Sequence, residues 1–107
     1  MGTSRRYADD VDRRSDEKYI ARLAKQAPLQ TLSPQELELS IQPVTKTPKP
    51  EIVRAWVRFG AEPFRVKHAE AVMWTSSAIA IRFTACGTEY RCWVWANAVE
   101  IPRREVT

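Results

Sequence analysis

The sequence has few of the residues from which catalytic and metal sites are usually built. Among 107 residues it contains one histidine, two cysteines and three glycines. His68 stands alone, and Cys86 and Cys92 lack the paired spacing and neighbouring histidines of a zinc site. The glycines are too far apart for a phosphate-binding loop. We therefore expect a protein with no cofactor, no metal and no catalysis, in which both thiols stay reduced.

Long apolar runs are also absent. No stretch approaches the roughly 20 apolar residues that cross a bilayer, and the first residues, "MGTSRRYADDVDRRSDE", are charged where a secretory signal would be apolar. These features predict a cytoplasmic protein with no membrane contact, monomeric or weakly associating. Lys and Arg exceed Asp and Glu by 17 to 13, a mild basic excess that permits nucleic-acid binding without requiring it.

The N-terminal part is expected to be a tail followed by two short helices. Residues 1–15 are almost all charged or small, which predicts a mobile tail. Across residues 16–42 the apolar pattern becomes helical. The first helix would be capped by Ser15 or Asp16, and Pro28 would end it.

The start of the second helix carries the clearest local signal in the chain. Ser33 suits the N-cap, Pro34 suits the first helical position, and Glu36 completes a capping box. The helix is expected to end near Gln42, because three prolines follow in "QPVTKTPKP". We interpret residues 43–50 as an extended, proline-rich linker.

From residue 51 the apolar period changes to two, which is typical of strands. The runs "IVRAWVRF", "PFRVKHAEAVMW", "AIAIRFTA", "EYRCWVWA" and "VEIP" predict five short antiparallel strands. The second strand should kink near His68, where the apolar parity slips. We expect an α+β chain with two short N-terminal helices, a proline-rich linker, a five-stranded antiparallel barrel over residues 51–102 and a tail at 103–107.

This series of strands resembles an SH3-like barrel. The stretch "WVWANAVEI" is similar to the end of such barrels, where a strand runs into a tight helical turn before an aliphatic residue re-enters the core. The resemblance implies that Val94 and Val99 are buried while Trp93 and Trp95 face outward. It also implies a module that holds extended, proline-containing peptides in an aromatic groove.

A second resemblance lies in the N-terminal half. The stretch "DEKYIARLAKQAPLQTLSPQE" is similar to a phrase near the start of small uncharacterised proteins of actinobacteria and their phages. The resemblance implies a phage-related accessory protein, and it supplies no catalytic residues.

Arginine and tryptophan alternate on one face of the first and of the fourth predicted strand. Guanidinium groups can neutralise phosphates and indoles can stack on unpaired bases, so this face suits single-stranded nucleic acid. The same rings could instead be covered by the N-terminal helices, or could hold a peptide. We expect one ring of the fourth strand to be covered and the other exposed. The candidate site residues are Arg54, Trp56, Arg58, Arg91, Trp93 and Trp95.

From these patterns we expect a non-catalytic accessory protein that binds a host or phage protein through the barrel. The alternative is a module that binds single-stranded nucleic acid or DNA through the arginine and tryptophan faces.

Overall fold

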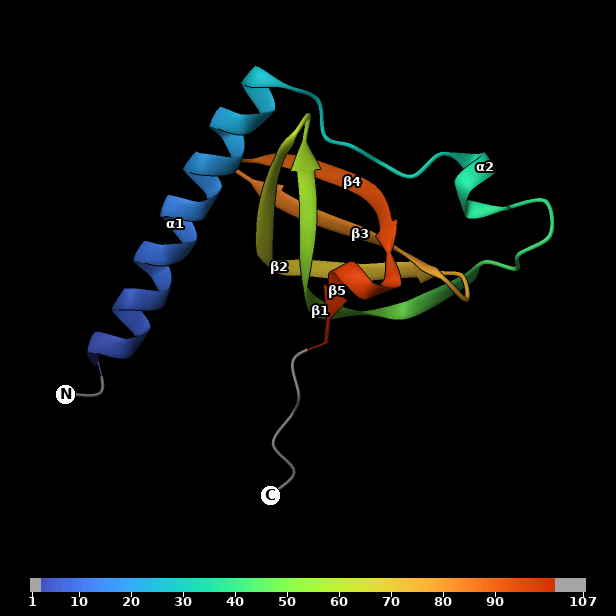
Figure 1. The fold of residues 1–107 in the computed structure, drawn as a ribbon. Helices are drawn as coiled ribbons and strands as arrows, with labels where there is room; N and C mark the ends of the chain where they lie inside the picture. The colour runs from blue at the N-terminus through green and yellow to red at the C-terminus, as the bar shows by residue number, and fades with distance from the viewer. Residues whose placement is uncertain (1–2, 102–107) are drawn as a thin grey trace.

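The computed structural model describes the backbone of residues 3–101 and the side chains of residues 14–101 (Figure 1). One long helix and one helical turn precede five antiparallel strands in the sheet order β4-β3-β2-β1-β5. The α+β class with five antiparallel strands is confirmed. The elements are α1 (Thr3–Gln26), α2 (Pro34–Leu37), β1 (Thr45–Phe59), β2 (Glu62–Trp74), β3 (Ala78–Ala85), β4 (Thr88–Trp95), the 3-10 turn η1 (Ala96–Ala98) and β5 (Val99–Glu100).

The expected pair of short helices is not confirmed. Helix α1 has 24 residues and begins at Thr3, so most of the segment predicted as a mobile tail is helical. No glycine or proline lies between its first and last residues, and nothing in the sequence stops the helix from extending through the charged segment. Residues 1–2 and the predicted tail at 103–107 lie outside the described residues.

Helix α2 is a single turn, and its start follows the prediction. Ser33 Oγ accepts the Glu36 N–H at 3.1 Å, and Glu36 Oε1 accepts the Ser33 N–H at 3.0 Å. The two bonds form the predicted capping box. The helix ends at Leu37, five residues before the predicted end at Gln42, because Glu38 adopts a left-handed conformation, with φ of 55°.

The predicted linker at residues 43–50 belongs mostly to β1. Thr45 and Lys46 already pair with β2, and regular pairing resumes at Glu51 after an irregular stretch. Prolines at positions 48 and 50 fall in that stretch, where a missing N–H breaks no ladder bond. A proline-rich composition therefore indicated an extended chain correctly but gave the wrong boundary for the sheet.

Two local irregularities of the strands follow the sequence. The β1–β2 register shifts between Val53 and Ala55, opposite the predicted kink at His68, because β2 carries one extra residue there. Cys86 and Gly87 form the two-residue turn between β3 and β4, with φ of 48° and 80°. Positive φ at both positions is what a tight hairpin of this kind requires.

The predicted closed barrel is not confirmed, because the sheet does not pair β4 with β1 or β5. An opening therefore remains between β4 and the C-terminal end of β1. Residues 28–32, here called the strap, cross this opening. On the β1 side the Gln30 N–H donates to Arg58 O at 2.8 Å and the Gly60 N–H donates to Pro28 O at 3.0 Å. These bonds flank an isolated antiparallel bridge between Leu29 and Phe59.

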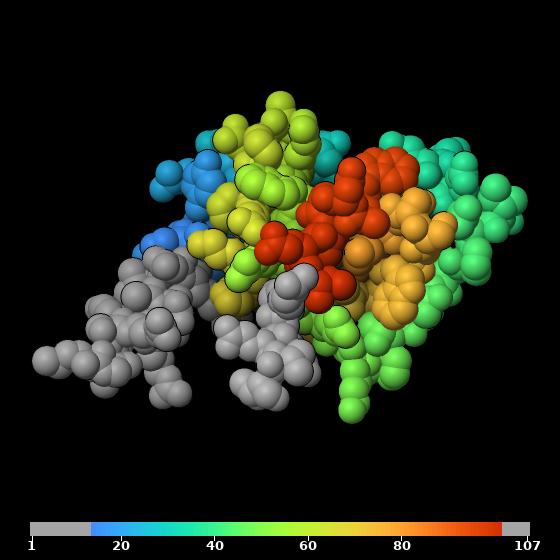
Figure 2. Space-filling view, turned by 60° about the horizontal axis from the view of Figure 1, so that its bottom comes forward, coloured from blue at the N-terminus to red at the C-terminus, as the bar shows by residue number. Residues whose placement is uncertain are grey.

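Helix α1 docks on one end of the sheet. Ile20 and Leu23 are buried in the same core as the inward-facing residues of the strands, and the Tyr19 ring lies 5.2 Å from the Phe64 ring. Glu17 Oε1 accepts the Cys86 N–H at 2.8 Å, which ties the helix to the β3–β4 turn. The helix and the sheet therefore share one core, and α2 lies on the opposite side of the sheet from α1 (Figures 1 and 2).

Candidate functional site

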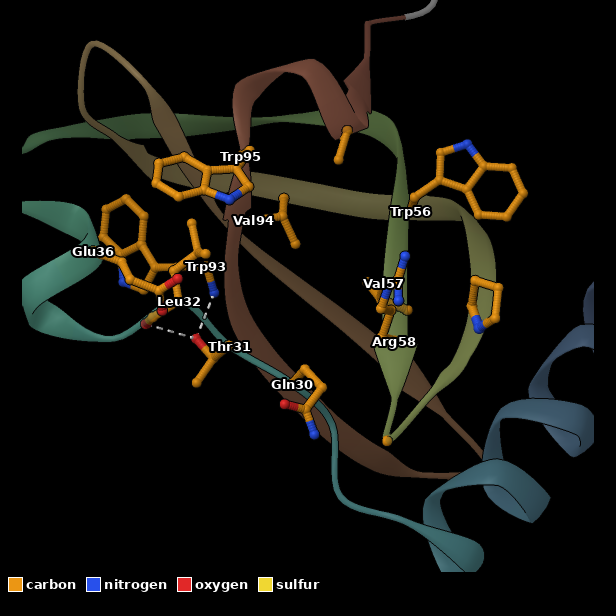
Figure 3. Close-up of a pocket in the computed structure, with 13 residues that line it drawn as sticks. Gln30, Thr31, Leu32, Glu36, Trp56, Val57, Arg58, Trp93, Val94 and Trp95 are labelled. Carbon is orange, nitrogen blue, oxygen red and sulfur yellow. Dashed lines mark hydrogen bonds between the residues drawn. The ribbon is translucent and has the colours of Figure 1, made fainter.

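A groove of about 570 Å³ lies between β1 and β4, beside the strap (Figure 3). Three of the four tryptophans of the chain line it, namely Trp56 from β1 and Trp93 and Trp95 from β4. Val57 and Val94 are buried and contribute the apolar part of its lining. We call this site the tryptophan groove.

Strand alternation explains how these rings reach the groove. Along β1 the odd-numbered residues from Val53 to Phe59 are buried, so Trp56 and Arg58 face outward. Along β4 Cys92 and Val94 are buried, so Trp93 and Trp95 turn the other way. Trp93 and Trp95 lie on the β4 side of the groove, whereas the Trp56 ring lies on the far side of β1 (Figure 3).

The two β4 tryptophans differ in exposure, as the sequence led us to expect. Trp95 is 42% exposed, whereas Trp93 is half-buried. The strap is bonded to the backbone of Trp93: the Trp93 backbone N–H donates to Thr31 Oγ1 at 2.9 Å, and Trp93 O accepts the Leu32 N–H at 3.1 Å. Of the two predicted covering segments, α1 packs at the other end of the sheet, while α2 places Glu36 in the same lining as Trp93.

The structure separates the six predicted site residues into two groups. Trp56, Arg58, Trp93 and Trp95 line the groove together. The two remaining residues, Arg54 and Arg91, do not belong to its lining.

Both remaining arginines have acidic partners. Arg54 Nη1 lies 3.1 Å from Glu100 Oε1, and Arg65 binds the other oxygen of the same carboxylate at 3.0 Å. Arg91 Nε lies 2.8 Å from Glu89 Oε2. These pairs are exposed and contribute little to stability, but they reduce the positive charge that the strand faces present to a ligand.

Sequence reasoning missed Glu36 and the strap as parts of the site. Glu36 lines the groove, although its spacing from Ser33 indicated a capping role alone. The strap gave no periodic signal, because a five-residue segment that bonds to two different strand edges has neither helical nor strand alternation. The Ala-Pro pair where the strap begins and the capping box that follows it are the sequence signals of a fixed connection between α1 and α2.

The described residues offer little reactive chemistry. Among side chains 14–101 no cluster of three or more His, Cys, Asp or Glu residues could hold a metal ion. Cys86 is exposed and Cys92 is buried, both as free thiols, and burial raises the pKa of the Cys92 thiol to about 12. A thiol in that state is a poor nucleophile at neutral pH.

A second, smaller groove of about 360 Å³ lies at the end of the sheet where β1 begins. Its lining includes Trp74, Ile79 and Ile101. Trp74 is 40% exposed, close to the value for Trp95, so it provides a matched control for the rings of the tryptophan groove.

Comparison with protein-family models, curated proteins and solved structures finds no match for this chain. No helix within residues 3–101 combines the length and the apolar character needed to cross a bilayer.

Proposed function

We propose that the chain is a non-catalytic accessory protein whose tryptophan groove binds an extended, proline-containing segment of a partner protein. The supporting observation is that Trp56, Trp93 and Trp95 line one groove together with the buried Val57 and Val94. Flat aromatic walls suit proline rings, and a peptide already in the polyproline conformation loses little entropy on binding. In this proposal the partner is a host or phage protein met in the cytoplasm, which rests on the N-terminal resemblance.

We also propose that the strands form an open variant of the SH3-like barrel. The order β4-β3-β2-β1-β5 and the 3-10 turn before β5 support this assignment. Val94 is buried and Val99 packs against the core, as the resemblance implies. The strap occupies part of the opening between β1 and β4.

The proposal is tested by titrating an acetylated eight-residue oligoproline peptide into ¹⁵N-labelled protein. The four indole N–H signals report on the four tryptophans separately. We expect the signals of Trp56, Trp93 and Trp95 to shift while that of Trp74 stays in place. Shifts absent from the three groove signals, or confined to Trp74, would contradict the proposal.

Matched variants then test the contribution of one ring. Trp95→Ala should weaken peptide binding about tenfold, since truncation of a central aromatic commonly costs more than about 1 kcal/mol of binding free energy. Trp74→Ala removes a ring of similar exposure outside the groove and should leave the affinity unchanged. Equal losses in the two variants would count against the groove.

Binding of single-stranded nucleic acid is a second candidate, favoured by the surroundings of Trp56. This ring is 52% exposed, lies opposite Arg65 on β2 and lies between Arg54 and Arg58 along β1. With Glu100 counted, the group still carries an excess of positive charge that could hold phosphates beside a stacking ring. Titration with a twelve-nucleotide oligothymidylate at 150 mM salt separates the two candidate functions. Saturable binding that quenches the fluorescence of Trp56 would favour nucleic-acid binding over peptide binding.

A further inference from the structure

Two guanidinium groups converge on one carboxylate at the outer face of β5, β1 and β2. Arg54 Nη1 lies 3.1 Å from Glu100 Oε1, and Arg65 Nη2 lies 3.0 Å from Glu100 Oε2. Arg54 and Glu100 are direct cross-strand partners in the β1–β5 pair, so strand pairing sets where the two arginines meet. The point between these arginines is therefore a position where the protein already holds an anionic group.

The present occupant of this position is weakly held. Glu100 is the last residue of the two-residue strand β5, its side chain is 58% exposed, and exposed ion pairs contribute little to stability. A carboxylate carries one charge, whereas a phosphate monoester carries about −1.5 to −2 at neutral pH and offers three acceptor oxygens. Guanidinium groups match phosphate in geometry as well as charge. A phosphate monoester can therefore displace Glu100 from between the two arginines.

An exposed indole lies beside this anion position. Trp56 is the direct cross-strand partner of Arg65, and it follows Arg54 by two residues on the same face of β1. Its ring lies on the far side of β1 from the two β4 tryptophans (Figure 3). Because the Cβ atoms of directly paired residues lie about 4.5–5.5 Å apart, a base can stack on Trp56 while the arginines hold its phosphate.

We propose that Arg54, Arg65 and Trp56 form a site for the phosphorylated end of a single strand of nucleic acid, with Glu100 as a built-in competitor. The arginines bind the terminal phosphate, the indole stacks on the terminal base, and Glu100 turns away when the phosphate enters. An internal phosphate diester carries a single charge and fewer free oxygens, so it competes less well for the same position. The inference rests on the second candidate function, nucleic-acid binding, and adds a preference for a strand end.

The next arginine along β1 favours a strand over a phosphorylated peptide. Arg58 follows Trp56 by two residues on the same outward face, so arginines flank the stacking ring on both sides. A nucleic-acid strand has a second phosphate beyond its first base, and Arg58 can neutralise that phosphate. A phosphotyrosine side chain combines one phosphate with one ring, and it leaves this third arginine without a role.

The test compares three twelve-nucleotide oligothymidylates, which carry a phosphate at the 5′ end, a phosphate at the 3′ end, or no terminal phosphate. Binding is followed through the indole N–H signal of Trp56 at one fixed salt concentration. We expect a strand with a terminal phosphate to bind several-fold more tightly than the strand without one. Arg65→Gln should abolish this preference, whereas Arg91→Gln, which removes the same charge from β4, should preserve it.

Glu100→Gln tests the competitor, and Glu89→Gln is its matched control. Each substitution removes one negative charge from an exposed ion pair, since the Glu89 and Glu100 side chains are 50% and 58% exposed. Glu100→Gln should raise the preference for the terminal phosphate several-fold, and Glu89→Gln should not change it. Equal increases in the two variants would show a general charge effect and overturn the site.

The remaining outcomes separate this inference from the function on which it rests. Equal affinity of the three strands for the native protein would overturn the terminal-phosphate site, although nucleic-acid binding would then stand. Failure of all three strands to bind would overturn both. A phosphotyrosine peptide that binds more tightly than the phosphorylated strands would overturn the assignment of the site to nucleic acid.

Discussion

Replacing Gly60 with alanine tests how tightly the strap and the end of α1 pack against the β1–β2 turn. Gly60 has φ of 62°, and its N–H donates to Pro28 O at 3.0 Å. A Cβ atom built at this position would lie 2.8 Å from the Ala27 Cβ, whereas carbon atoms normally pack at about 3.5–4.0 Å. The substitution therefore combines an unfavourable backbone conformation with a steric overlap.

The neighbouring hairpin offers a control that separates these two costs. Gly87 has φ of 80°, and a Cβ atom there would meet nothing within 4 Å. Gly87→Ala should cost only the left-handed conformation, about 1–2 kcal/mol of unfolding free energy. Gly60→Ala should cost about 1–3 kcal/mol more, the range for inserting a methyl group into a packed site.

Urea unfolding followed by far-ultraviolet circular dichroism measures both free energies. Adding Ala27→Gly to the Gly60→Ala variant should recover the steric part, because it removes the overlapping methyl group just beyond the end of α1. Equal losses for Gly60→Ala and Gly87→Ala would refute the packing, and so would a double variant with no recovery.

Three further outcomes follow from burial. Iodoacetamide should modify Cys86 in the folded protein and reach Cys92 only after unfolding; two adducts on native protein by mass spectrometry would contradict this. Because burial raises the Cys92 pKa from 9.0 to about 12, the unfolded state loses this proton first as pH rises above 9. The unfolding free energy should then fall by up to about 1.4 kcal/mol per pH unit. The Cys92→Ala variant should not show this decrease when its unfolding free energy is measured by chemical denaturation at the same pH values. Leu23→Ala should cost about 2–5 kcal/mol in the same assay, whereas Leu39→Ala, at a 41% exposed position, should change stability by no more than about 0.5 kcal/mol.

Period-two alternation predicted most of the sheet. The first predicted strand ends at Phe59 and the third spans residues 78–85, as in the structure. The kink near His68 was visible because a bulge shifts which parity is apolar. These features depend on neighbours in the sequence, and local pattern is sufficient to predict them.

Features that depend on contacts between distant residues were not predictable in this way. The length of α1 was missed because charged residues were interpreted as a tail, although they form helices readily. The pairing of Arg54 with Glu100, 46 residues away, was likewise not predictable. An outward-facing position on a strand does not reveal which acid lies opposite.

The strap explains why the opening between β1 and β4 forms a groove with fixed walls. Its first residues bond to Arg58 of β1 and to Gly60 in the turn that follows, and Leu32 bonds to Trp93 of β4. Helix α1 is held to the core at one end of the strap and α2 is capped at the other, so the five residues between them have little freedom to leave. A peptide that enters the groove would therefore meet a strap already bonded to both of its flanking strands. Because the same five residues position Glu36 next to the β4 rings, the N-terminal segment sets the chemistry of the groove as well as its width.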